Sequence, residues 1–246
     1  MRPILQAGGR CIVMSMVRSI EELTEVTDPS WPEIQEMAST STNAVTIIPC
    51  EPENGQKALY RLQMTAHSTL GGIVLNCAAM TVDHGWIKVL GSGLPGLPDP
   101  ATVAGFPSNP GDTPPVSPGL VVAVDVLGGQ FAIDGGGLGV QPGQICYWAP
   151  DSLSWQGLGC GHSAFIGWLL SGDRGTFYDL FRWPGWETET EQLGIAQGYS
   201  VVPFLWTKEY DVATASRAVV PLNELFSLSS EMAEKLGGQP PLPWPH

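Results

Sequence analysis

The sequence places a carboxylate directly beside an imidazole at one position, in the run Asp83-His84-Gly85-Trp86. A neighbouring carboxylate can fix the tautomer of a histidine that acts as a general acid or base. Adjacent residues of an extended segment point to opposite faces, however, and Asp and Gly favour turn geometry. No Gly-x-Ser-x-Gly nucleophile motif accompanies the pair. The run therefore indicates a turn between two strands, with a hydrolase-like Asp-His site as the alternative.

Metal and nucleotide chemistry have weaker signals. Cys160 and His162 could be two zinc ligands, but a structural site needs four, and His67 and His246 stand in unrelated contexts. The glycines at 135–137 and 139 lack the helix N-terminus or lysine that a phosphate cradle requires. We therefore expect no metal, no cofactor and no catalytic residue set.

Two tryptophans flank a turn in the run Arg182-Trp183-Pro184-Gly185-Trp186. Exposed, they would form a surface of the kind that dominates interface energies. Buried, they would close the core, with Arg182 paired to an acid. Trp206 is a further candidate for the same surface. We predict a set of binding residues made of Asp83, His84, Trp86, Arg182, Trp183, Trp186 and Trp206.

The elements that must position these residues are strands and helices in mixed order. Apolar and β-branched runs predict strands at 44–49, 72–77, 86–90, 120–126, 130–134, 144–150, 151–158 and 201–207. Capping boxes, Ser19 with Glu22 and Ser30 with Glu33, open two predicted helices, and others are expected at 53–64, from Ser163 and from Pro221. Hairpin-like neighbours without strict βαβ alternation predict an α+β domain, in which helices flank an antiparallel or mixed sheet.

Length and composition suit one large domain, since the chain has 246 residues of which 43% are hydrophobic. We expect residues 1–16 to form a disordered leader and residues 17–229 a single α+β domain. The Pro/Gly-rich stretch at about 94–119 is long for a loop, so we expect an insertion that is disordered or lies along the surface. Residues 230–246 contain many prolines, and we expect a disordered tail.

The net charge of the chain limits which classes of binding partner are expected. The chain has 11 Lys and Arg against 24 Asp and Glu, a net charge of -13. Nucleic-acid binding needs clustered basic residues, so that class of partner is not expected. The acidic balance fits a basic protein partner or simply solubility. No apolar run approaches the roughly 20 residues of a membrane span. Five cysteines without a Cys-x-x-Cys motif favour a reducing, cytoplasmic setting.

Several blocks carry a family resemblance: VDHGWIKVLGSG, DVLGGQFAIDGG, YWAPDSLSWQGLG, FIGWLLSGD and FYDLFRWPGWE. Over about residues 17–228 the chain resembles the bacterial family catalogued as domain of unknown function 2625, which has no assigned activity. Residues 120–173 are also similar to the SUKH superfamily of α+β binding modules, many of which resemble immunity proteins that neutralise toxins. The resemblance implies a SUKH-like, non-catalytic protein-binding module. An uncharacterised hydrolase and a small-molecule-binding domain are the alternatives.

Overall fold

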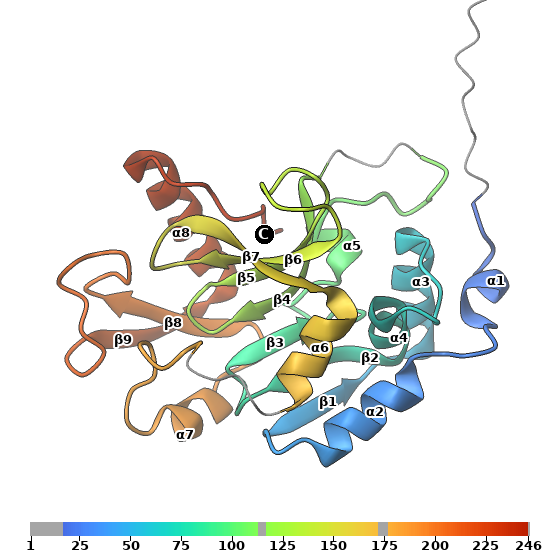
Figure 1. The fold of residues 1–246 in the computed structure, drawn as a ribbon, viewed down its shortest axis with the longest axis horizontal. Coiled ribbons are helices and arrows are strands. Elements are labelled where there is room, and N and C mark those ends of the chain that lie inside the picture. The colour runs from blue at the N-terminus through green and yellow to red at the C-terminus, as the bar shows by residue number, and fades with distance from the viewer. Residues whose placement is uncertain (1–16, 113–116, 172–176, 246) are drawn as a thin grey trace, which may run out of the picture.

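A seven-stranded antiparallel sheet forms the centre of the molecule, and its strands pair in the order of the sequence (Figure 1). The computed structural model describes residues 17–112, 117–171 and 177–245. The α+β class predicted from the sequence is confirmed. The sheet consists of β1 (Val45–Pro49), β2 (Cys77–Val82), β3 (Ile87–Leu90), β4 (Gly119–Asp125), β5 (Gln130–Asp134), β6 (Gln144–Ala149) and β7 (Ser154–Gly161), and a separate hairpin pairs β8 (Gln197–Val202) with β9 (Ser216–Pro221).

Helices surround the sheet. Figure 1 shows α1 to α4 grouped on one side of the molecule and α8 on the other, beside the β8–β9 hairpin. The expected leader, residues 1–16, lies outside the described residues. The helices are α1 (Ile20–Thr24), α2 (Trp31–Thr40), α3 (Pro52–Leu62), α4 (Thr69–Asn76), α5 (Pro100–Val103), α6 (His162–Ser171), α7 (Trp186–Glu191) and α8 (Leu222–Leu236).

Side chains alternate between the two faces of the sheet along each strand, and both faces of the central strands are buried by packed elements. One face carries Met80 and Phe131 and shares a core with α2, α4 and α6. The other face carries Ala132 and packs against Leu225 and Phe226 of α8. Burial on both sides explains why several strands are nearly continuous apolar runs in the sequence.

The segment Thr69–Asn76 is helix α4, so the strand predicted at 72–77 was wrong. Ser68 begins the helix by accepting a hydrogen bond from the Gly71 amide at 3.0 Å. Gly72 allows close packing, since a Cβ at this position would collide with Ser30 Oγ. A short, fully buried run has no polar face by which a helical period could be told from a strand period.

The C-terminal tail packs onto the sheet, in contrast to the disorder expected from residue 230. Helix α8 continues to residue 236. The Gln130 side chain then makes two hydrogen bonds with the backbone of Leu242, at 3.0 and 2.8 Å. Trp148 Nε1 donates to the Gln239 carbonyl at 2.8 Å. Prolines exclude regular hydrogen-bonded structure from this segment but not packing, because polar side chains of the sheet satisfy its backbone.

The described part of the Pro/Gly-rich insertion is ordered around α5. Asp99 caps this helix by accepting from the Thr102 amide at 3.0 Å, and it also pairs with Arg61 of α3 at 3.3 Å. Leu97 and Ala101 are fully buried. The insertion therefore contributes to the core; its residues 113–116 lie outside the described part of the chain.

A buried carboxylate, Asp125, organises the turn between β4 and β5. Its Oδ1 accepts hydrogen bonds from the Leu127 and Gly129 amides, each at 2.9 Å. Its Oδ2 accepts from the hydroxyls of Tyr147 at 2.7 Å and Tyr178 at 3.1 Å. Burial raises the pKa of Asp125, although these four hydrogen bonds favour the charged form and oppose the shift. One carboxyl group thus holds together a turn, a strand and the segment after α6.

His162, at the start of α6, is expected to make the stability of the protein depend on pH in the acid range. Both ring nitrogens are buried with no hydrogen-bond partner in the part of the chain that the structure describes, and burial lowers the pKa of His162 to about 4. The unfolded chain takes up this proton near pH 6.5, so the stabilising contribution is complete above that pH and is lost as the pH falls towards 4. We expect the unfolding free energy of His162→Phe to depend less on pH between pH 4 and 6.5 than that of the parent. Urea unfolding at a series of pH values measures this dependence. The exposed His67→Phe serves as control, and an unchanged slope in His162→Phe would contradict the assignment.

Candidate functional site

The turn between β2 and β3 contains three consecutive residues in the left-handed backbone region. Their φ angles are 61° at Asp83, 56° at His84 and 85° at Gly85. The Trp86 amide donates to the Asp83 carbonyl at 2.9 Å and closes the turn. The left-handed conformation costs a non-glycine residue roughly 1–2 kcal/mol. Such a turn persists only where surrounding contacts hold it.

Arg182 supplies one of these contacts. Its guanidinium forms an ion pair with the Asp83 carboxylate. The same group lies over three aromatic rings, 4.1 Å from the centroid of Trp186, 5.3 Å from Trp86 and 5.4 Å from Tyr178. We call Asp83, Arg182 and these three rings the arginine cage. Both predicted segments, 83–86 and 182–186, thus meet in space, although almost a hundred residues separate them.

The arginine cage is closed rather than open to a partner. Trp86 and Tyr178 are 0% and 2% exposed, and the neighbouring Trp183 is 3% exposed. Among the described residues, Trp86 Nε1, Trp183 Nε1 and Arg182 Nε are buried without a hydrogen-bond partner, and the cluster is packed through aromatic contacts. Burial lowers the pKa of Arg182 to about 10, which leaves the guanidinium charged at neutral pH. Arg182 fills the cage, so the cage is part of the protein interior. This corresponds to the second arrangement considered for this segment, in which the tryptophans are buried and Arg182 is paired to an acid.

His84 has a different partner from its neighbour. Its Nδ1 lies 2.6 Å from Glu191 Oε1 at the end of α7, and its ring contacts Trp186 edge-on at 5.8 Å. Asp83 points to the buried Arg182, whereas His84 is about a third exposed. The two side chains therefore serve different contacts, and the Asp83-His84 pair offers no dyad for the hydrolase alternative. Glu191 is a residue that sequence reasoning missed, because 107 residues separate it from His84.

Trp206 lies apart from the arginine cage. It stacks on Phe204, with ring centroids 4.6 Å apart and planes at 10°, and it packs beside Trp148 and Leu153. The structure therefore brings together six of the seven predicted residues and places Trp206 in another small cluster.

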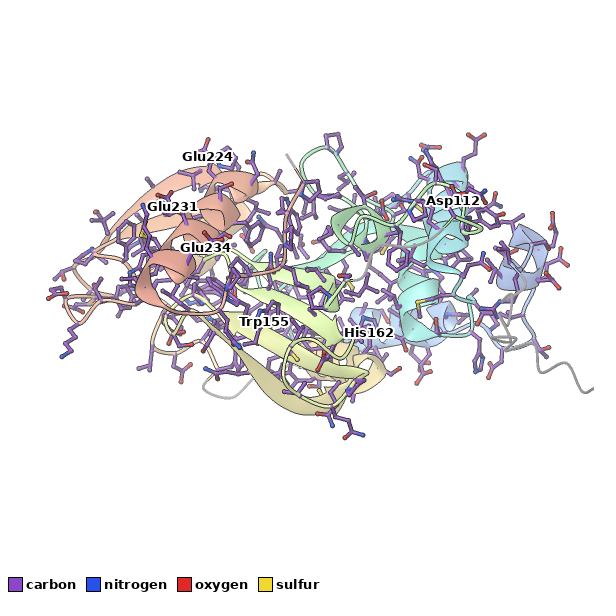
Figure 2. All side chains as sticks on the ribbon, turned by 90° about the horizontal axis from the view of Figure 1, so that it is seen from above. Asp112, Trp155, His162, Glu224, Glu231 and Glu234 are labelled. Carbon is purple, nitrogen blue, oxygen red and sulfur yellow. The ribbon has the colours of Figure 1, made fainter. Side chains whose placement is uncertain are left out.

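A cavity opens elsewhere, between β7, α8 and the C-terminal tail. We call it the tail groove; its volume is about 760 Å³. Trp155, Phe226 and Trp244 contribute aromatic side chains, while Glu231 and Glu234 of α8 contribute carboxylates. Figure 2 shows the two glutamates on α8 and Trp155 on the adjacent sheet. Sequence reasoning missed this site because it took the tail, which forms one wall, as disordered.

Neither a metal site nor a membrane-spanning helix is found among the described residues. Across residues 17–112, 117–171 and 177–245, no group of three or more His, Cys, Asp or Glu side chains could hold a metal ion. Over the same ranges no helix has the length and apolar character that a membrane crossing requires.

Comparisons with known proteins identify the family. The model of the family described as protein of unknown function DUF2625 matches residues 20–225. The chain is 35% identical over 219 residues to the Escherichia coli K12 protein YbfG, which is described as uncharacterised; the match covers 89% of this chain and 98% of that protein. An uncharacterised protein of Haemophilus influenzae is 29% identical over 223 residues, covering 89% and 96% respectively.

No solved structure matches the fold, so the SUKH-like architecture stays a prediction. The family match spans most of the chain, and the match to YbfG extends over nearly the whole of both proteins. The chain therefore belongs to the DUF2625 family of proteins of unknown function.

Proposed function

We propose that this protein is a non-catalytic, cytoplasmic binding module of the immunity-protein type, and that its tail groove takes a basic segment of a partner protein. The observation that carries the proposal is the combination of aromatic walls with two exposed carboxylates in one groove. Aromatic anchors supply most of the energy at interfaces, and charged rims supply steering and specificity.

Charge around the tail groove favours a cation. Helix α8 carries exposed Glu224, Glu231 and Glu234 against a single Lys235, which is itself paired with Glu231. From residue 89 to 173 the sequence has no Lys or Arg, and this stretch includes β4 to β7. A groove set in such an acidic surface raises the local concentration of basic partners. The free thiols of Cys50, Cys77, Cys146 and Cys160 agree with the reducing compartment that the proposal assumes.

A random peptide library displayed on phage tests the proposal and does not require the natural partner to be identified first. We expect enriched peptides to combine Lys or Arg with an aromatic or proline anchor. Replacing both glutamates, Glu231→Gln with Glu234→Gln, should weaken these peptides about tenfold, since two rim charges together contribute on the order of 1.4 kcal/mol. Fluorescence anisotropy of labelled peptides measures the change.

Helix α2 offers a matched control. Glu33→Gln with Glu36→Gln makes the same charge change at the same spacing on an exposed helix face away from the groove. This variant should bind the selected peptides like the parent. Enrichment of acidic or compositionally unbiased peptides, or equal weakening in both double variants, would count against a basic partner in the tail groove.

A further inference from the structure

A second, smaller cavity lies beneath the edge of the sheet formed by β1 to β3. We call it the Lys88 pocket; its volume is about 340 Å³, within the range of small-molecule sites. Thr46, Thr81 and Lys88 line it from the sheet, and His84 of the β2–β3 turn and Glu191 of α7 also line it. None of the residues that line the tail groove contributes to it.

The sheet register builds a polar row into this pocket. Thr46 pairs directly with Thr81, and Thr81 pairs directly with Lys88, across three neighbouring strands. Directly opposed residues of antiparallel strands point to the same face. The row continues to Val124 of β4, which belongs to the apolar core on this face. Beyond Val124 the row reaches the buried Gln130, whose amide is satisfied by the backbone of Leu242, whereas Thr46, Thr81 and Lys88 line the pocket.

Lys88 is the feature that packing alone does not explain. The residue is 2% exposed, and its Nζ donates to the carbonyls of Gly194 and Gln197. An ammonium group has three N–H donors, so one remains for a further acceptor. Among the described residues no carboxylate lies within 4.0 Å of Nζ, and Asp125 acts on it only at longer range. Buried charges are ordinarily paired, because desolvation of an unpaired ion is costly.

Charge and hydrogen-bonding capacity define the ligand that would complete the site. A single lysine balances one negative charge, and the hydroxyls of Thr46 and Thr81 can donate to the same group. The His84 and Glu191 side chains, which also line the pocket, are 36% and 54% exposed, and the Glu191 carboxylate can accept a hydrogen bond. A phosphate dianion fits less well, because it would face one cation and a nearby carboxylate.

We propose that the Lys88 pocket binds a small monocarboxylic acid that also carries a hydrogen-bond donor, such as a hydroxy or amino acid. The carboxylate contacts Lys88 and the two threonine hydroxyls, and the donor faces Glu191. This site is independent of protein binding at the tail groove and gives the module a small-molecule ligand.

Titration of the full-length protein with defined probes tests this assignment. The probes are glycine, alanine, lactate and 3-hydroxybutyrate, with inorganic phosphate and the matching alcohols for comparison, followed in ¹H–¹⁵N spectra. We expect saturable shifts of the Thr81 and Lys88 amides with at least one hydroxy or amino acid, at concentrations up to about 20 mM, which suffices to detect a millimolar Kd. Lys88→Met should weaken binding at least tenfold, and the exposed Lys57→Met should leave it unchanged.

A second variant covers the case in which Lys88→Met fails to fold. Thr46→Val with Thr81→Val preserves side-chain shape and removes two donors, and we expect it to weaken the same probe at least threefold. The groove variant Glu231→Gln with Glu234→Gln should bind the probe normally, which separates this proposal from the proposed function. No saturable shift with any carboxylate, equal binding by the threonine variant, or binding of phosphate alone would overturn the assignment.

Discussion

Asp125→Ala is expected to lower the free energy of unfolding by about 4 kcal/mol or more. The substitution leaves four buried donors, two backbone amides and the hydroxyls of Tyr147 and Tyr178, without their shared acceptor. Each unsatisfied buried donor costs about 1–3 kcal/mol. In a chain of this length, such a loss lowers the Tm by about 10 °C. Urea and thermal unfolding followed by circular dichroism measure both quantities.

Asp125→Asn is the matched control and also tests the charge. The amide oxygen can still accept from both backbone amides, so we expect a much smaller loss of stability. Because burial raises the native pKa of Asp125 above its unfolded value of 3.8, the native state binds the proton more tightly. The contribution of this group to stability therefore falls as the pH rises from the unfolded pKa to the native pKa. The stability of the Asn variant should not show this decrease with rising pH. If Asp125→Asn lowered the free energy of unfolding as much as Asp125→Ala does, the charge itself would have to stabilise the turn.

Asp83→Asn is expected to lower the free energy of unfolding by about 3 kcal/mol. Asn tolerates the left-handed backbone of the turn, so the substitution mainly removes the negative charge. Arg182 then remains among Trp86, Tyr178 and Trp186 without that carboxylate. Removing one member of a buried ion pair typically costs about 3–5 kcal/mol, because the other charge stays desolvated. Chemical unfolding of the variant gives the loss directly.

Two further variants test whether the effect of Asp83→Asn comes from its buried ion pair with Arg182. The double variant Asp83→Asn with Arg182→Met removes both charges and should recover part of the lost stability. The exposed ion pair between Lys235 and Glu231 on α8 provides the contrast, since Lys235→Gln should change stability by less than about 0.5 kcal/mol. The double variant could instead lose more unfolding free energy than the two single variants lose together. That result would mean that Arg182 stabilises the protein through its aromatic contacts rather than through the ion pair.

Local patterns in the sequence were sufficient where a few neighbouring residues decide the conformation. The capping box of Ser19 and Glu22 is present, with both of its hydrogen bonds. The hairpin of β4 and β5 forms from the strands predicted at 120–126 and 130–134. The same reasoning failed at Ser30, whose hydroxyl donates to the Ser68 carbonyl at 2.9 Å instead of capping α2. A partner 38 residues away outcompeted the local one.

Of the candidate site, the sequence by itself determined the residue types: a turn at 83–86, a tryptophan-rich segment at 182–186, and the acidic balance of the whole chain. Only the tertiary structure decided that Arg182 fills the aromatic space between those segments, and that His84 pairs with Glu191 rather than with Asp83. It alone also placed Lys88 in a pocket and the proline-rich tail along a groove. The physical reason is that burial and ion pairing depend on contacts between residues about a hundred positions apart, which no local period or spacing encodes.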